Sequence, residues 1–203
     1  MRPCQFRYPG RIAGGRILAR RPAGRERILG LDPGSRATGY GVIEKQGAQL
    51  RFITCGVIRT SPRLPFSDRL QEIHDGICEV IGCQQPNWAA IEEVFMARNP
   101  MSALKLGHAR GVIMLAASKQ GIPVKEYSAR AVKQAVAGYG QAGKAQVQQM
   151  VRALLKLTSC PSQDAADALA VALCHANHCN LLADRMNVSP GPMLSSSRNE
   201  RPK

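Results

Sequence analysis

The sequence contains no apolar run that approaches the roughly 20 consecutive residues of a transmembrane helix. Its N-terminus also lacks the apolar stretch of a secretory signal peptide. The cysteines number seven and lie mostly within apolar segments, which is typical of reduced thiols, so we expect no disulfide framework. These absences favour a soluble intracellular protein, and the length of 203 residues predicts one domain and not a two-domain ATPase.

Acidic residues are scarce, with 14 Asp and Glu against 28 Lys and Arg, which gives a net charge of +14. Half of this excess lies on residues 1–27, where eight arginines face a single acid. The remainder of the chain is only mildly basic. A basic excess favours a polyanionic partner but does not determine the fold.

The two ends of the chain differ in composition from its centre. Residues 1–27 are rich in Gly, Pro and Arg without apolar periodicity, so we predict a disordered basic arm. Such an arm is compatible with a DNA-binding segment or an organelle-targeting peptide, but we favour an idle tail or a start-site artefact. Residues 181–203 are predicted to form a second disordered tail, which leaves one folded domain at 28–180.

Hydrophobic periodicity between the tails alternates between two residues and 3.6 residues. Strands are predicted at 28–31, 40–43, 50–58, 88–91 and 122–124. Helices are predicted around 70–81, over 101–120, after the N-cap Ser128, over 147–155 and after Pro161. Three strands in a meander followed by strands separated by helices predict an α/β fold with a mixed five-stranded sheet flanked by helices.

Four acids occupy positions at which they are able to meet. Asp32 and Glu92 end the first and fourth strands, which finish at the same edge of the sheet if they run parallel. Asp164 and Asp167 are three residues apart, and therefore neighbours, at the start of the last helix. Clustered carboxylates need a counterion, and Mg²⁺ prefers oxygen ligands. In a basic protein this combination favours phosphodiester hydrolysis by two ions about 4 Å apart.

Each acid also has an ordinary structural interpretation. Asp-Pro-Gly forms a turn by itself, a strand can end in solvated glutamates, and acids complement the dipole at a helix start. Their joint pattern is the argument for a site. Glu93 competes with Glu92, but alternation sends the two side chains to opposite faces of a strand, so only one can join the cluster.

Five segments of the chain carry distinctive motifs. They are ILGLDPGS at 28–35, TGYGVI at 38–43, AIEEVFMA at 90–97, SALKLG at 102–107 and DAADALA at 164–170. Together they resemble the RuvC family of bacterial crossover junction endonucleases. The resemblance runs in order from residue 27 to about 178. The arm at 1–27 departs from the family pattern, which starts a few residues before the first strand.

The resemblance implies a ribonuclease H-like fold, a homodimer in the bacterial cytoplasm, and resolution of Holliday junctions by paired symmetric nicks. It implies two Mg²⁺ ions per site, with Mn²⁺ as a substitute, and a short thymine-containing cleavage consensus. It also implies the branch-migration proteins RuvA and RuvB as partners. The catalytic and metal-binding residues matched by the motifs are Asp32, Glu92, Asp164 and Asp167.

The same resemblance assigns DNA contacts to several further residues. Phe95 is matched to a residue that stacks on unpaired bases, although core packing is the usual role of a phenylalanine. Lys133 and Lys144 flank the loop at 138–143 and are matched to residues that hold phosphates. Three more basic residues are predicted to extend that surface: Arg98, Lys105 and Arg110.

Two functions remain as alternatives. The Asp-x-Gly turn followed by a Gly-rich hairpin resembles the phosphate loop of actin-like ATPases, and a non-catalytic junction-binding module would use the acids only at helix and strand ends. Zinc is not expected at 174–179, because the two Cys/His pairs at i, i+4 lie on different sides of a helix. We expect buried thiols and exposed imidazoles there.

Overall fold

The computed structural model describes residues 24–93 and 99–187, and within them a five-stranded sheet with five helices. The strands are β1 (Arg25–Asp32), β2 (Ala37–Gln46), β3 (Gln49–Arg59), β4 (Trp88–Glu92) and β5 (Val124–Tyr127). The helices are α1 (Phe66–Gln84), α2 (Pro100–Lys119), α3 (Ala129–Ala137), α4 (Lys144–Leu154) and α5 (Gln163–Asn187). The strand order is β3-β2-β1-β4-β5.

The sheet is mixed, as predicted. β1, β2 and β3 form an antiparallel meander, whereas β4 pairs with β1 and β5 pairs with β4 in parallel. Since β1 and β4 run parallel, their carboxyl ends lie at the same edge of the sheet.

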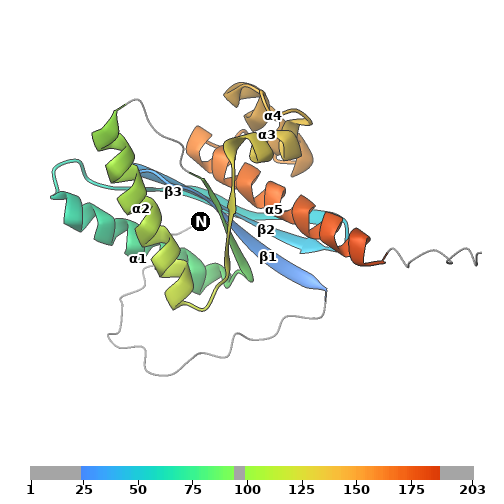
Figure 1. Ribbon diagram of the computed structural model, residues 1–203, viewed down its shortest axis with the longest axis horizontal. Coiled ribbons are helices and arrows are strands. Elements are labelled where there is room, and N and C mark those ends of the chain that lie inside the picture. The colour runs from blue at the N-terminus through green and yellow to red at the C-terminus, as the bar shows by residue number, and fades with distance from the viewer. Residues whose placement is uncertain (1–23, 94–98, 188–203) are drawn as a thin grey trace, which may run out of the picture.

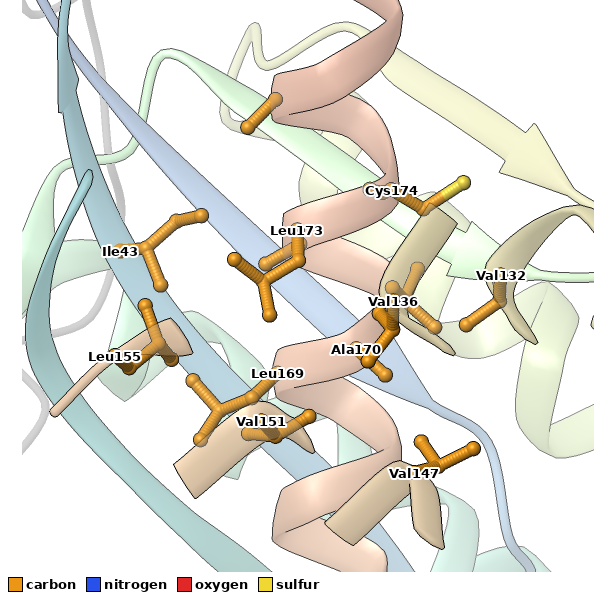
Figure 2. Close-up of a cluster of buried hydrophobic side chains, with 14 of the residues drawn as sticks. Ile43, Val132, Val136, Val147, Val151, Leu155, Leu169, Ala170, Leu173 and Cys174 are labelled. Carbon is orange, nitrogen blue, oxygen red and sulfur yellow. The ribbon is translucent and has the colours of Figure 1, made fainter. Parts of the chain in front are cut away.

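Two layers of helices cover the two faces of the sheet (Figure 1). Side-chain alternation along β1 sends Leu29 and Leu31 into a core with α1 and α2, and Ile28 into a core with α3, α4 and α5. In this second core, Leu169 and Leu173 of α5 lie close to Ile43 of β2 (Figure 2). The sheet is thus buried on both faces, and α5 lies directly on one of them.

Glycine on the strands lets α5 approach the sheet closely. A Cβ atom built on Gly30 would lie 2.0 Å from the Ala168 carbonyl oxygen, and one on Gly39 would lie 2.0 Å from that of Asp164. A Cβ on Gly41 would lie 2.6 Å from the Leu169 side chain. The backbone of α5 therefore occupies the space that side chains on β1 and β2 would take.

The folded region is longer than predicted at both ends. Residues 25–27, assigned above to the arm, belong to β1. Arg27 anchors them, because its N–H donates to Asn87 Oδ1 over 2.8 Å. Its guanidinium also contacts the Gln84 carbonyl and Glu44. At the other end, α5 continues through Asn187, so the tail predicted at 181–203 is helical over its first seven residues. The rest of the arm and tail lies outside the described residues.

The fifth strand was predicted too early. Ile122 belongs instead to the turn that caps α2, because its N–H donates to the Ala117 carbonyl over 3.1 Å after Gly121 adopts a positive φ of 74°. The strand begins at Val124, opposite Ala89. β5 lies at the edge of the sheet, and its two central residues, Lys125 and Glu126, are exposed. Its sequence therefore shows no clear alternation of apolar and polar residues.

Within the described ranges, no helix has the length and apolar character needed to cross a membrane.

Candidate active site

The strand pairing places Asp32 beside Glu92. Leu31 of β1 is in register with Ile91 of β4. The next residues, Asp32 and Glu92, are the last of their strands and lie at the same edge of the sheet. Asp32 is two residues from Gly30, whose face lies under α5, and therefore points to that side. The first two predicted acids thus lie next to each other on the α5 side of the sheet.

Alternation also distinguishes Glu92 from Glu93. Ala90 packs in the core beneath α5, while Ala89 and Ile91 pack against α1 and α2. Glu92 follows Ala90 by two residues and shares its side of the sheet. Glu93 also lines the cleft described below, but it follows the strand, and its N–H donates to the Tyr127 carbonyl over 2.8 Å.

Helix α5 brings the other two acids to this edge. Asp164 lies in its first turn, directly over Gly39, which is the residue of β2 paired with Asp32. Asp167 is one turn further along, on the side that faces the cleft. Because the backbone of α5 packs closely against Gly30 and Gly39, both acids lie near the sheet.

The acids border an open cleft of about 290 Å³. Its walls include three of the four acids (Asp32, Glu92 and Asp167) and two lysines (Lys133 of α3 and Lys144 of α4). Lys144 Nζ lies 4.0 Å from Asp167 Oδ2. Two predicted phosphate-binding lysines and three of the predicted acids therefore share one cleft, whereas Asp164 is not among its lining residues.

Burial and neighbouring carboxylates raise the pKa of three of the acids: Asp32, Glu92 and Asp167. Burial is the main cause for Asp32, and the charges of Asp167, Glu92 and Asp164 add to it, so that its pKa rises to about 7 against the opposing effect of Lys144. Burial and Asp167 also raise the pKa of Glu92. Burial raises that of Asp167, although Lys144 lowers it. Mutual repulsion of this kind shows that the four acids are electrostatic neighbours.

This cluster is chemically suited to a hard divalent cation. Carboxylate oxygens are the preferred ligands of Mg²⁺, and a divalent cation would offset the cost of ionising several buried acids together. Among the described residues, however, no group of three or more His, Cys, Asp or Glu side chains is arranged so that it could hold a metal ion. Three of the four acids thus line one cleft, but their side chains do not together form a metal-ligand group.

The shifted pKa of Asp32 predicts a pH effect on stability in metal-free buffer. The pKa is raised from 3.8 to about 7, so the folded state binds more protons than the unfolded state between these values, and stability falls as the pH rises through them. The wild-type chain is expected to lose stability relative to Asp32→Asn over this range. Urea unfolding of both proteins at pH 5 and pH 8 in EDTA measures the difference, and an unchanged difference would contradict the predicted burial of charge.

The other predicted DNA contacts fall in different places. Lys105 is exposed on α2 and does not line the cleft. Arg110 is engaged within the fold, since its guanidinium pairs with Glu126 and its Nε lies 3.3 Å from the Glu92 carbonyl oxygen. Phe95 and Arg98 lie outside the described residues.

The prediction of exposed imidazoles at the end of α5 was wrong for one histidine. His175 is only 2% exposed, because it packs between Trp88 and Tyr127. Its Nδ1 lies 2.7 Å from the Tyr127 hydroxyl, and burial lowers its pKa to about 4. His178 is exposed as expected.

Two supporting contacts of the site were not predicted. Arg110 holds the backbone of Glu92, and Arg69 of α1 holds the turn that follows Asp32. Each joins residues at least 18 positions apart, so no local motif marks either contact.

A mixed sheet with a carboxylate cleft at the ends of β1 and β4, closed by an acidic helix, defines a nuclease of the ribonuclease H-like fold. The model of the RuvC family, crossover junction endodeoxyribonuclease RuvC, matches residues 28–175. The chain belongs to this family. It is thus a crossover junction endodeoxyribonuclease, a metal-dependent hydrolase of DNA phosphodiester bonds that serves DNA recombination and repair.

The chain aligns with most of the length of individual relatives. The chain is 56% identical over 158 residues to the RuvC protein of Syntrophotalea carbinolica, covering 78% of this chain and 98% of the relative. It is 59% identical over 150 residues to that of Tolumonas auensis, covering 74% and 86%.

Solved structures agree with the fold. The Thermus thermophilus RuvC structure in complex with a Holliday junction substrate matches with a TM-score of 0.73 at 39% identity, covering 77% of this chain and 96% of that chain. A yeast mitochondrial Holliday junction resolvase matches with a TM-score of 0.54 at 11% identity, covering 79% and 86%, which supports the fold alone.

Proposed function

We propose that this chain resolves four-way DNA junctions by paired symmetric nicks, with Asp32, Glu92, Asp164 and Asp167 as its catalytic and metal-binding residues. The observation that carries this assignment is the single cleft that Asp32, Glu92 and Asp167 line, with Asp164 in the first turn of α5. Burial and the three other acids also raise the pKa of Asp32 to about 7. Such a concentration of repelling carboxylates in an open cleft costs free energy in the absence of a cation. Strongly perturbed groups of this kind cluster at functional sites.

Two Mg²⁺ ions are the cofactor that best suits these acids, with Mn²⁺ as a substitute. When bound, such a pair activates the attacking water and stabilises the leaving oxygen of a phosphodiester. Asp32 is central to the proposed ligand set because the other three acids all influence it. Side-chain rotation would be needed to draw three carboxylates onto one ion, since they do not form a shell as they stand.

Lys133 and Lys144 are proposed to hold the phosphates on either side of the scissile bond. Both line the cleft from helices other than the acidic one, and both lower the pKa values of Glu92 and Asp167. A phosphate bound between the lysines would lie in the same cleft as the acids. The roles proposed for Phe95 and Arg98 rest on the sequence alone, and those of Lys105 and Arg110 have weaker structural support.

A homodimer is proposed to form through the outer face of α2. This face carries large exposed apolar side chains, of which Met101 is 60%, Leu104 57% and Leu115 53% exposed. Leu104 and Leu115 border a shallow groove of about 440 Å³ in which Gly107 and Gly111 leave room for another helix. A junction with two-fold symmetry requires two like active sites, and a two-fold dimer supplies them.

The double variant Leu104→Glu, Leu115→Glu is therefore expected to be monomeric. Introducing charge into an apolar interface should weaken the dimer at least about thirtyfold, as losing ~2 kcal/mol at a hot spot does. Light scattering measures the change. Leu154→Glu, at an exposed leucine on α4, is the matched control and should stay dimeric. An unchanged dimer in the double variant would refute the assignment of this face.

The family resemblance extends the proposal to partners and location. RuvA and RuvB are proposed to deliver the junction in the bacterial cytoplasm, and cleavage is proposed to favour a short thymine-containing sequence. These statements are supported by the matched motifs and the bacterial relatives.

A synthetic four-way junction incubated with the protein and Mg²⁺ tests the proposed function. Symmetric nicks in two strands of like polarity, with linear duplex of the same sequence left intact, are expected. Equal cutting of linear duplex would refute junction selectivity, binding without metal-dependent scission would favour the non-catalytic module, and ATP turnover would favour the ATPase. The same assay on a version that starts at Arg25 reports the contribution of the arm.

A further inference from the structure

The turn at 33–36 joins β1 to β2, and the backbone carbonyls of its last three residues all accept hydrogen bonds. The Thr38 hydroxyl donates to the Gly34 carbonyl over 2.9 Å. The Ser35 and Arg36 carbonyls accept from residues beyond β3, as described below. This turn follows Asp32 directly, and its Pro33 lines the carboxylate cleft. Its backbone therefore determines where the end of β1 lies.

Thr60 and Arg69 together hold this turn, and we call the pair the clamp. Thr60, which follows the last residue of β3, provides its first part. Its N–H donates to the Arg36 carbonyl over 3.0 Å. Its hydroxyl lies 3.1 Å from the Ser35 carbonyl oxygen and 3.4 Å from that of Arg36, so one proton is shared between them. The residue is only 7% exposed, and a buried hydroxyl that loses such partners costs stability.

Arg69 of α1 provides the second part. Its Nη2 donates to the Ser35 carbonyl, and its Nε lies 3.1 Å from the Thr60 hydroxyl oxygen. The guanidinium also packs near the Phe66 ring, 5.8 Å from its centre. A planar guanidinium can serve two acceptors at once, whereas a lysine ammonium lacks this fixed fork.

Arg69 is not among the residues that line the carboxylate cleft, and α1 covers the face of the sheet opposite α5 (Figure 1). Any effect of Arg69 on chemistry at Asp32 therefore has to pass through the turn. Thr60 belongs to the same arrangement, because its hydroxyl donates to the Ser35 carbonyl that Arg69 also contacts, and its hydroxyl oxygen accepts from Arg69 Nε.

We propose that Arg69 and Thr60 form one positioning unit, which fixes the turn at 33–36 and thereby the place of Asp32 in the cleft. This inference deepens the proposed function and rests on it. Neither residue is a catalytic residue, since neither reaches the cleft. The unit acts by limiting the conformations of the turn, so its loss affects the site without removing a ligand.

Arg69→Ala is expected to lower the single-turnover rate of junction cleavage about tenfold to a hundredfold, as small misplacements in active sites do. Its junction affinity in EDTA should stay within about twofold of wild type, because no phosphate contact is lost. Two readouts report the turn itself: faster hydrogen exchange of the peptide covering 33–38, and weaker Mn²⁺ binding to the DNA-free protein by calorimetry. Arg63→Ala, an exposed arginine in the same segment, is the charge control and should match wild type in all four measurements.

A double-mutant cycle with Thr60→Val tests whether the two residues act as one. Valine keeps the shape of threonine without its hydroxyl, which limits the risk of misfolding. If they act together, the double variant should lose no more than about threefold beyond the worse single variant. Multiplied effects would overturn the shared role, and so would hydrogen exchange unchanged in Arg69→Ala. An equal loss of junction affinity in EDTA would show a direct DNA contact instead.

The failure of this inference can be told apart from that of the proposed function. If the wild-type protein cleaves no junction, the proposed function fails. The exchange and Mn²⁺ measurements still report on the clamp in that case, because they need no substrate.

Discussion

Replacement of Asp32 by asparagine is expected to reduce junction cleavage by about a thousandfold while leaving junction binding intact. The proposed metal-held charge is worth several kcal/mol in the transition state, and a tenfold change in rate corresponds to about 1.4 kcal/mol. Asparagine keeps the shape of the side chain but removes the charge that the three other acids influence. Single-turnover cleavage in Mg²⁺ and junction affinity in EDTA measure the two effects separately.

The matched control is Glu93→Gln. Glu93 lines the same cleft and neighbours Glu92, but it lies beyond the last residue of β4 and is not among the charges that raise the pKa of Asp32. Its replacement should change the cleavage rate by less than about fivefold. A variant of Asp32 that loses binding and cleavage together would show a structural role for the aspartate. Equal losses at Glu93 and Asp32 would refute the choice of Glu92 over its neighbour.

Much of the site could be predicted because its parts follow local rules. Asp32 and Glu92 end apolar strands, and Asp164 and Asp167 share one helical face, so sequence spacing placed each acid on an element correctly. The assignment of these acids as ligands is still a prediction. The parallel course of β1 and β4, which joins the two strand ends, is only a condition in the sequence-based prediction, and the structure meets this condition.

Other features depend on contacts between distant segments. The strand at 25–27 is held by Asn87, Gln84 and Glu44, none of which marks the start of a strand in the sequence. The buried His175 is determined by Trp88 and Tyr127 from two other strands. The clamp of Arg69 and Thr60 likewise joins three segments at one turn. Periodicity reports one element at a time, so it could not reveal these contacts.

Replacement of Gly39 by alanine is expected to separate α5 from the sheet at the carboxylate cleft. The new Cβ would lie 2.0 Å from the Asp164 carbonyl oxygen and 2.6 Å from its carbon, which are backbone atoms that cannot rotate away. We expect the free energy of unfolding to fall by about 3 kcal/mol, the upper range for overpacking. Cleavage should fall about a hundredfold, because the acids of α5 would move away from Asp32.

Gly82→Ala provides the matched control for this substitution. Gly82 lies in α1, a Cβ there would meet nothing within 4 Å, and alanine is favoured over glycine in a helix by about 1 kcal/mol. This variant should be as stable as wild type or more stable, with unchanged cleavage. Urea unfolding and single-turnover cleavage are measured on both variants. A Gly39→Ala protein with wild-type stability and activity would show that close packing of α5 on β2 does not bring the four acids together.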